Sequence, residues 1–259
     1  MRMMKKVLGT VTVLALSVSL LAGCGSTAAS PVSSAASTAA ESTTSSVVSE
    51  TTSAAADENE AAAAQLLNDL TGSYQELWPV ILADEYKQTW LDDCTALVGE
   101  ENAEAAFEKL SSMVTSDVYG EDAVEAYANG GGAYFCGFTN SLATLTFDGE
   151  TSTISGTDKD GNVLFSHTYH YIGMEPVRGL YEFESDDADS GEFTYFFLAP
   201  DTSAETYHIE FRYGSDADAL SQYDAGDYAY WVASGISTDC DQTMIDNCIE
   251  LFCTENLAD

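Results

Sequence analysis

Two residues of zinc-ligating type stand two positions apart in one strand-like stretch of the sequence. The stretch covers residues 205–214, and the pair is His208 and Glu210. Successive side chains of a strand point to opposite sides, so His208 and Glu210 share one face. Zinc binds imidazole nitrogen and carboxylate oxygen, usually with four tetrahedral ligands. The pair therefore predicts part of a zinc site and requires at least one ligand from elsewhere.

Few further imidazole ligands are available, because the chain has only three histidines. His167 and His170 lie together in a second strand-like stretch, residues 163–171. Their spacing of three places them on opposite faces of that strand. His167 is the best third ligand if its strand lies alongside that of His208. We therefore expect His167, His208 and Glu210 to hold Zn²⁺ in an open site, with a fourth position for water or a partner's ligand.

A purely structural interpretation of the same residues stays open. His208 and Glu210 can bond each other on a solvated sheet face, and Arg212 lies on that face as well. Arg212 would then complete a row of ion pairs across neighbouring strands. In that case the row stabilises a sheet and binds nothing.

The elements that must position these residues divide into a helical part and a strand part. Residues 57–129 have apolar residues at helical spacing, and Pro79 predicts a break there. Within this part the expected helical stretches are residues 61–70, 74–82, 101–114 and 121–127. A last helix is expected over residues 242–252, with Asp239 or Asp241 as its N-cap.

After the glycine run at residues 130–132 the apolar period falls towards two, which indicates strands. The expected strands are residues 133–138, 142–147, 152–156, 163–171, 179–184, 192–198 and 206–213. Turn residues such as Asp148-Gly149 and Asp160-Gly161 join them. Short strands joined by tight turns predict an α+β fold, in which an antiparallel β-barrel carries N-terminal helices and a C-terminal helix.

Three stretches, taken in order, resemble the ZinT family of extracytoplasmic zinc-binding proteins. They are residues 70–79 (LTGSYQELWP), residues 176–182 (PVRGLYE), and Leu198-Ala199-Pro200 followed by His208-Ile209-Glu210. The resemblance covers about residues 66–257. It implies a calycin-like barrel with helices packed against it, and a function in binding zinc.

The zinc motif implied by this resemblance is only partly present. The family has a histidine four residues before the proline that matches Pro200, and here that position is Phe196. His208 matches the first histidine of the family's His-x-His pair, and Glu210 replaces the second. The resemblance therefore implies either a rebuilt site that uses His167 or a barrel that no longer binds metal.

The N-terminus predicts export and a lipid anchor. Arg2, Lys5 and Lys6 precede an apolar run that ends in Leu-Ala-Gly-Cys at residues 21–24. A charged start, an apolar run and small residues before a cleavage point are typical of a secretory signal, and this ending resembles the lipobox of bacterial lipoproteins. Residues 1–23 are thus the expected signal peptide. Cys24 is the expected lipidated residue, which would anchor an extracytoplasmic protein to a bacterial membrane. An ordinary signal peptide with an incidental cysteine is the alternative.

The segment after Cys24 has the composition of a tether. Residues 25–56 consist almost entirely of Ser, Thr, Ala, Val, Gly and Glu, without an aromatic residue. Such a chain cannot bury enough apolar surface to offset the entropy of ordering it. We therefore expect a disordered tether over residues 24–56 and one folded domain over residues 57–259.

Charge and cysteine content limit the partners. Asp and Glu number 43 against 8 Lys and Arg, for a formal net charge of −35. Nucleic acid is excluded as an expected partner, because phosphate binding requires clustered basic residues. Cations are favoured, although acidity also serves solubility alone. Besides Cys24 there are five cysteines, an odd number, for which one disulfide near the C-terminus or none is expected.

Three classes of function compete. The first is a binding protein for a divalent metal, which it passes to a metal importer. The second is a metal-free barrel that acts as a cell-surface interaction module. The third, an enzyme with a small ligand in the barrel mouth, ranks last, because the sequence shows no arrangement of a nucleophile and a base; it also has no nucleotide-binding glycine loop and no nucleophile elbow. We therefore expect no enzymatic activity.

Overall fold

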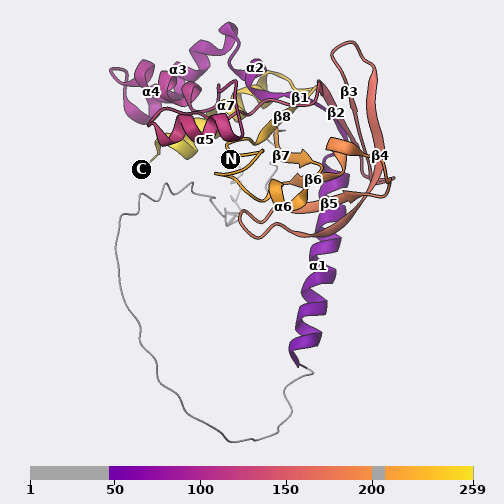
Figure 1. Cartoon of the computed structure of the whole chain (residues 1–259). Coiled ribbons are helices and arrows are strands. Elements are labelled where there is room, and N and C mark those ends of the chain that lie inside the picture. The colour runs from indigo at the N-terminus through magenta and orange to yellow at the C-terminus, as the bar shows by residue number, and fades with distance from the viewer. Residues whose placement is uncertain (1–46, 200–207, 259) are drawn as a thin grey trace, which may run out of the picture. The chain divides into compact units, whose positions relative to one another are not determined.

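The computed structural model describes residues 47–199 and 208–258, with side chains from Glu58 onward (Figure 1). Its centre is a closed barrel in which every strand pairs antiparallel with the next along the chain, and β8 pairs with β1. The strands are β1 Gly72–Glu76, β2 Thr144–Asp148, β3 Thr153–Thr157, β4 Val163–Met174, β5 Tyr181–Ser185, β6 Tyr195–Leu198, β7 His208–Gly214 and β8 Ala233–Ser237. Closure leaves none of these strands as an unpaired sheet edge.

Helices surround this barrel. They are α1 Val47–Asp69, α2 Leu77–Ile81, α3 Lys87–Val98, α4 Ala103–Ser112, α5 Glu121–Ala128, α6 Ala217–Leu220 and α7 Gln242–Leu257, with 3₁₀ turns at Asp84–Tyr86 (η1) and Gly191–Phe193 (η2). Helices α2, α3, α4 and α7 gather on one side of the barrel (Figure 1). They enclose a second apolar core around Trp78, Trp90 and Ile249. The molecule therefore has a barrel core and a helical core, and the barrel wall lies between them.

Aromatic side chains fill the inside of the barrel. Alternate residues of each strand point inward, and the inward positions supply Phe165, Tyr169, Phe196, Phe211 and Tyr213, all buried in the barrel core. The rings of Phe196 and Tyr213 have centroids 5.3 Å apart. The barrel is therefore held together by ring packing across its interior.

The C-terminal half of α1 packs on the barrel through Ala63, Leu66 and Leu67, which are buried in the same core. The close approach extends to the turn after β2, where a Cβ on Gly149 would lie 2.4 Å from the Cα atom of Asn68. Helix α1 begins at Val47, so its first residues fall in the range expected to be a tether. The predicted signal peptide, Cys24 and the tether up to residue 46 lie outside the described residues.

The predicted α+β class and antiparallel calycin-like barrel, with N-terminal helices and a C-terminal helix, are confirmed. The N-cap of α7 is Asp241, whose carboxylate accepts a hydrogen bond from the Met244 amide at 3.0 Å. Within the described ranges, no helix is both long and apolar enough to cross a membrane.

Two local predictions were wrong, and one further strand was not predicted. The start of the stretch at residues 74–82 is strand β1, and only α2 within it is helical. Residues 133–138 form no strand, because Phe135 makes only isolated bridges to Thr115 and Trp231. Strand β8, rich in small residues, was not expected from the sequence.

Candidate metal-binding site

The two faces of β7 have different surroundings. Ile209, Phe211 and Tyr213 are almost completely buried in the barrel core. His208 and Glu210 alternate with them and therefore lie on the outer face of the wall. There His208 is half-buried and Glu210 is exposed. The expectation that His208 and Glu210 share a face is confirmed, and that face is the outside of the barrel.

Outside the wall, His208 and Glu210 line a pocket that α2 and α7 complete. Trp78 of α2 and Phe252 of α7 form part of its apolar lining, with ring centroids 4.7 Å apart. The cavity measures about 40 Å³. Since one water requires about 10–15 Å³, this space accommodates a cation with part of its hydration.

Helix α7 brings two more groups of metal-ligating type to this pocket, the thiol of Cys248 and the carboxylate of Glu255. These residues stand seven apart, which is about two helical turns, so they share one face of α7. Burial raises the pKa of the Cys248 thiol to about 12, which disfavours the thiolate that metals bind. Glu255 is exposed, so its carboxylate is the better donor of the two.

The donor types of this pocket fit zinc, which accepts nitrogen, oxygen and sulfur ligands. In the structure, however, these donor groups lie too far apart to form a closed metal site. Among the described residues, no three His, Cys, Asp or Glu side chains are grouped closely enough to hold a metal ion. A site here therefore has to be completed by movement of its side chains.

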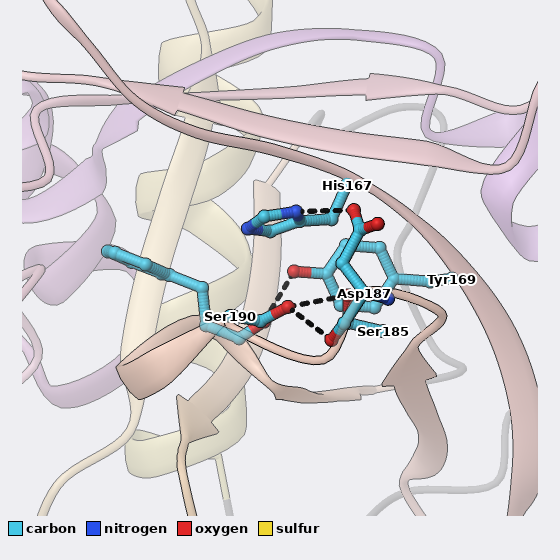
Figure 2. Close-up of polar contacts among 6 residues, drawn as sticks. His167, Tyr169, Ser185, Asp187 and Ser190 are labelled. Carbon is cyan, nitrogen blue, oxygen red and sulfur yellow. Dashed lines mark hydrogen bonds and ion pairs between the residues drawn. The ribbon is translucent and has the colours of Figure 1, made fainter.

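His167 lies on the other side of the barrel wall. Its ring is 5.9 Å from that of Phe165, which is buried in the barrel core. Its Nδ1 atom is 2.7 Å from Oδ2 of Asp187, on the loop after β5 (Figure 2). The structure therefore does not bring His167 to His208 and Glu210, because alternation along β4 turns His167 inward while His208 points outward. The predicted three-residue site is corrected accordingly.

His170 faces the other way from His167, as the sequence predicted, and is exposed. Its Nδ1 atom lies 2.7 Å from Oδ1 of Asp186. Two neighbouring aspartates thus each bind one histidine of β4. Figure 2 shows Ser190 near the His167–Asp187 pair, but its hydroxyl donates to Ser185 Oγ and to the Asp187 carbonyl. These contacts stabilise the loop between β5 and β6.

Phe196 stands where the resemblance implies a histidine, and its side chain is completely buried inside the barrel. His208 and Glu210 are on the outer face. The positions matched to the family's zinc motif are therefore divided between the two sides of the wall. A histidine at position 196 would point into the aromatic core and away from the pocket.

Arg212 also lies on the outer face of β7, but it does not join Glu210 in the expected row of ion pairs. It is completely buried and donates to the carbonyl oxygens of Leu220, Gln222 and Tyr228. Its guanidinium also lies 4.3 Å from the ring centroid of Tyr223. Burial lowers the pKa of this guanidinium. Arg212 therefore fastens the segment around α6 to the barrel wall.

Cys248 and Glu255 were not predicted as site residues. Their helical spacing was available as a signal, but the helix was expected to end at residue 252. Glu255 fell beyond that end, whereas α7 continues to Leu257. The approach of α7 to β7 is a tertiary contact that the local pattern does not contain.

Comparison with known proteins gives similarity at the level of structure. No family model matches the sequence, and no curated protein matches it. The structure is similar to the Zn(II)-bound ZinT-like domain of AdcA from Streptococcus pneumoniae, with a TM-score of 0.45 and 14% identity over 71% of this chain and 89% of that one. It is also similar to Zn(II)-bound AdcA from the same organism, with a TM-score of 0.42 and 13% identity over 72% of this chain and 35% of that one.

Proposed function

We propose that this protein is a lipid-anchored extracytoplasmic binding protein for a divalent metal ion, zinc first, which it holds between β7 and α7. The observation that carries the proposal is that His208, Glu210 and Glu255 line one pocket. The proposed ligands are these three side chains, with Cys248 behind them. His167 has no part in this site.

Movement of the two carboxylates is the step that completes the site. Glu210 and Glu255 are exposed, and ordering a glutamate side chain costs at most about 2 kcal/mol of rotamer entropy. A bound dication offsets that cost through direct coordination. The net charge of −35 also raises the local concentration of cations around the protein.

The donor set favours zinc without excluding harder ions. One imidazole and two carboxylates resemble the two-nitrogen, one-oxygen sets of open zinc sites, but contain more oxygen. Oxygen ligands suit manganese, so we expect weaker selectivity for zinc over Mn²⁺ than a three-histidine site has. A position left to water or to a partner's ligand would permit transfer of the ion to a metal importer.

Zinc titration of the wild type and four variants tests this site. We expect His208→Ala to weaken zinc binding by about 100-fold or more, since loss of a mere supporting contact already costs about 10–100-fold. Isothermal titration calorimetry measures the change. Binding should also weaken as the pH is lowered, because only the neutral imidazole is a ligand.

Two other histidines provide matched controls for that titration. His167→Ala and His170→Ala each remove an imidazole from the same chain, and both should bind zinc as the wild type does. Glu255→Gln should behave like His208→Ala. A loss of binding in His167→Ala with retention in His208→Ala would contradict the proposed location, and equal heats for all variants would contradict the site itself.

The anchor has its own test. We expect the Cys24→Ala protein to appear in the soluble fraction, whereas the wild type stays with the membrane, because the lipid on this thiol is the proposed attachment. Two acyl chains give stable anchoring where one is marginal. Fractionation of cells that express each protein measures the distribution. Equally firm membrane attachment of both proteins would contradict the lipid anchor.

A metal-free interaction module is the second candidate, and one observation favours it. The inside of the barrel is filled by buried aromatic rings, including Phe196 at a position where the resemblance implies a ligand. In that case the β7–α7 pocket serves only to pack α7 on the wall. The titration distinguishes the candidates, because a metal-free module gives no zinc binding at sub-millimolar concentration in any variant.

A further inference from the structure

Two cysteines far apart in the sequence meet between the helices that cover the barrel. The Sγ atoms of Cys94 in α3 and Cys253 in α7 lie 3.9 Å apart. Both side chains are completely buried, at the place where α3 packs on α7. We propose that Cys94 and Cys253 form a disulfide when the chain folds in an oxidising compartment.

The geometry requires little change to reach the bonded state. A disulfide has sulfur atoms about 2.05 Å apart, so the two sulfurs must approach by roughly 2 Å. Small rotations about the two Cα–Cβ bonds and a slight shift of the helices supply this. The structure places the two sulfurs of this pair in contact.

The chemistry balances with an external disulfide as the oxidant. One cysteine thiolate attacks a sulfur of that disulfide, which forms a mixed disulfide and expels the first thiolate of the oxidant; the second cysteine thiolate then attacks the cysteine sulfur of the mixed disulfide and expels the other. The Cys94–Cys253 bond forms, both cysteine protons are released, and the oxidant leaves as two thiols after it has taken up two electrons. A thiol–disulfide oxidoreductase of the extracytoplasmic compartment belongs to this chemical class. The bond requires the proposed export, but not the proposed metal site.

Burial determines when the bond can form. It raises the pKa of the Cys94 thiol and that of the Cys253 thiol above their ordinary values, so thiolate is scarce once the helices have docked. Buried sulfurs are also closed to a bulky oxidant. Oxidation therefore occurs during folding, before α3 and α7 have packed stably against each other. After docking, the same burial protects the bond from reduction.

The bond would stabilise both the domain and the pocket beside it. It joins residues 159 positions apart, and a cross-link over a long loop removes much of the entropy of the unfolded chain. Cys253 lies next to Phe252 and two positions before Glu255, which both line the proposed metal pocket. Pinning Cys253 to α3 thus fixes this end of α7 over β7.

Refolding of the mature chain with the Cys24→Ala substitution, in a mixture of oxidised and reduced glutathione, tests the proposal without any need for export. The product is trapped by alkylation and cleaved at acidic residues, since Glu250 separates Cys248 from Cys253. We expect mass spectrometry to find the Cys94 peptide linked to the Cys253 peptide, while Cys136, Cys240 and Cys248 are alkylated. Five alkylated cysteines in a folded product, or a bond between any other pair, would overturn the proposal.

Variants extend the test to stability. Reduction should lower the thermal midpoint of the wild type by about 10 °C, and should change nothing in Cys94→Ala, where Cys253 becomes alkylated. Cys136→Ala removes another buried cysteine and should keep the reduction-sensitive midpoint. A wild type whose midpoint is insensitive to reduction would count against the bond even if Cys94→Ala fails to fold.

Discussion

Replacement of Arg212 by methionine is expected to lower the free energy of unfolding by about 3–5 kcal/mol, the cost of breaking a buried charged network. Its guanidinium has no exposed surface and donates to the carbonyls of Leu220, Gln222 and Tyr228. Methionine retains much of the volume and removes all of these bonds. The carbonyls would then be buried without a donor, and buried Glu175 would lose positive charge nearby.

Urea denaturation measures this loss. Arg178 provides the control, because it also packs on Tyr223, with its guanidinium carbon 4.1 Å from the ring centroid, but is only half-buried. Arg178→Met should cost about 1 kcal/mol or less, as other half-exposed cation–π contacts do. Equal losses for the two variants would show that the carbonyl bonds of Arg212 are not what fastens the α6 segment.

Replacement of Phe196 by alanine should destabilise the protein by a similar amount, about 3–5 kcal/mol, the range for removing a buried phenylalanine. Phe196 is completely buried and contacts the rings of Phe165, Tyr169 and Tyr213 at centroid distances of 5.8, 5.4 and 5.3 Å. Neighbouring strands of a closed barrel cannot collapse into the cavity. Calorimetric unfolding of the two proteins measures the difference.

Two further substitutions separate packing from metal binding at this position. Phe196→Leu should lose clearly less stability than Phe196→Ala, because it leaves a smaller cavity. Phe196→His places an imidazole where the family resemblance implies one, yet it should not tighten zinc binding, since position 196 faces the barrel interior. A marked gain in zinc affinity for Phe196→His would show that the inner face is the metal site.

Much of the fold was predictable because it has strong local signals. Alternation predicted the faces of β7 correctly, and Asp241 was correctly included among the candidate caps of the last helix. Strand β1 was not predictable in this way, because Tyr74, Leu77 and Trp78 also match helical spacing. Strand β8 reads Ala-Ser-Gly-Ile-Ser, whose small residues carry little strand preference. It is a strand because β1 and β7 pair with it on both sides.

The composition of the site was predictable only in part, for a physical reason. Alternation relates residues within one strand, but it does not say which face becomes the inside of a closed barrel. His167 and His208 could thus be assigned to faces of their own strands and still not be matched to each other. Glu255 and Cys248 come from α7, whose docking on β7 depends on packing around Trp78 and Phe252.

The most direct measurement of the central claim is an anomalous difference map, collected at the zinc absorption edge from crystals of the protein grown with zinc. We expect one dominant peak in the pocket between β7 and α7, within bonding distance of His208 Nδ1 or Nε2 and of the Glu210 or Glu255 carboxylate. A dominant peak beside His167 and Asp187 would contradict the account. So would a map in which zinc lies only on scattered surface carboxylates.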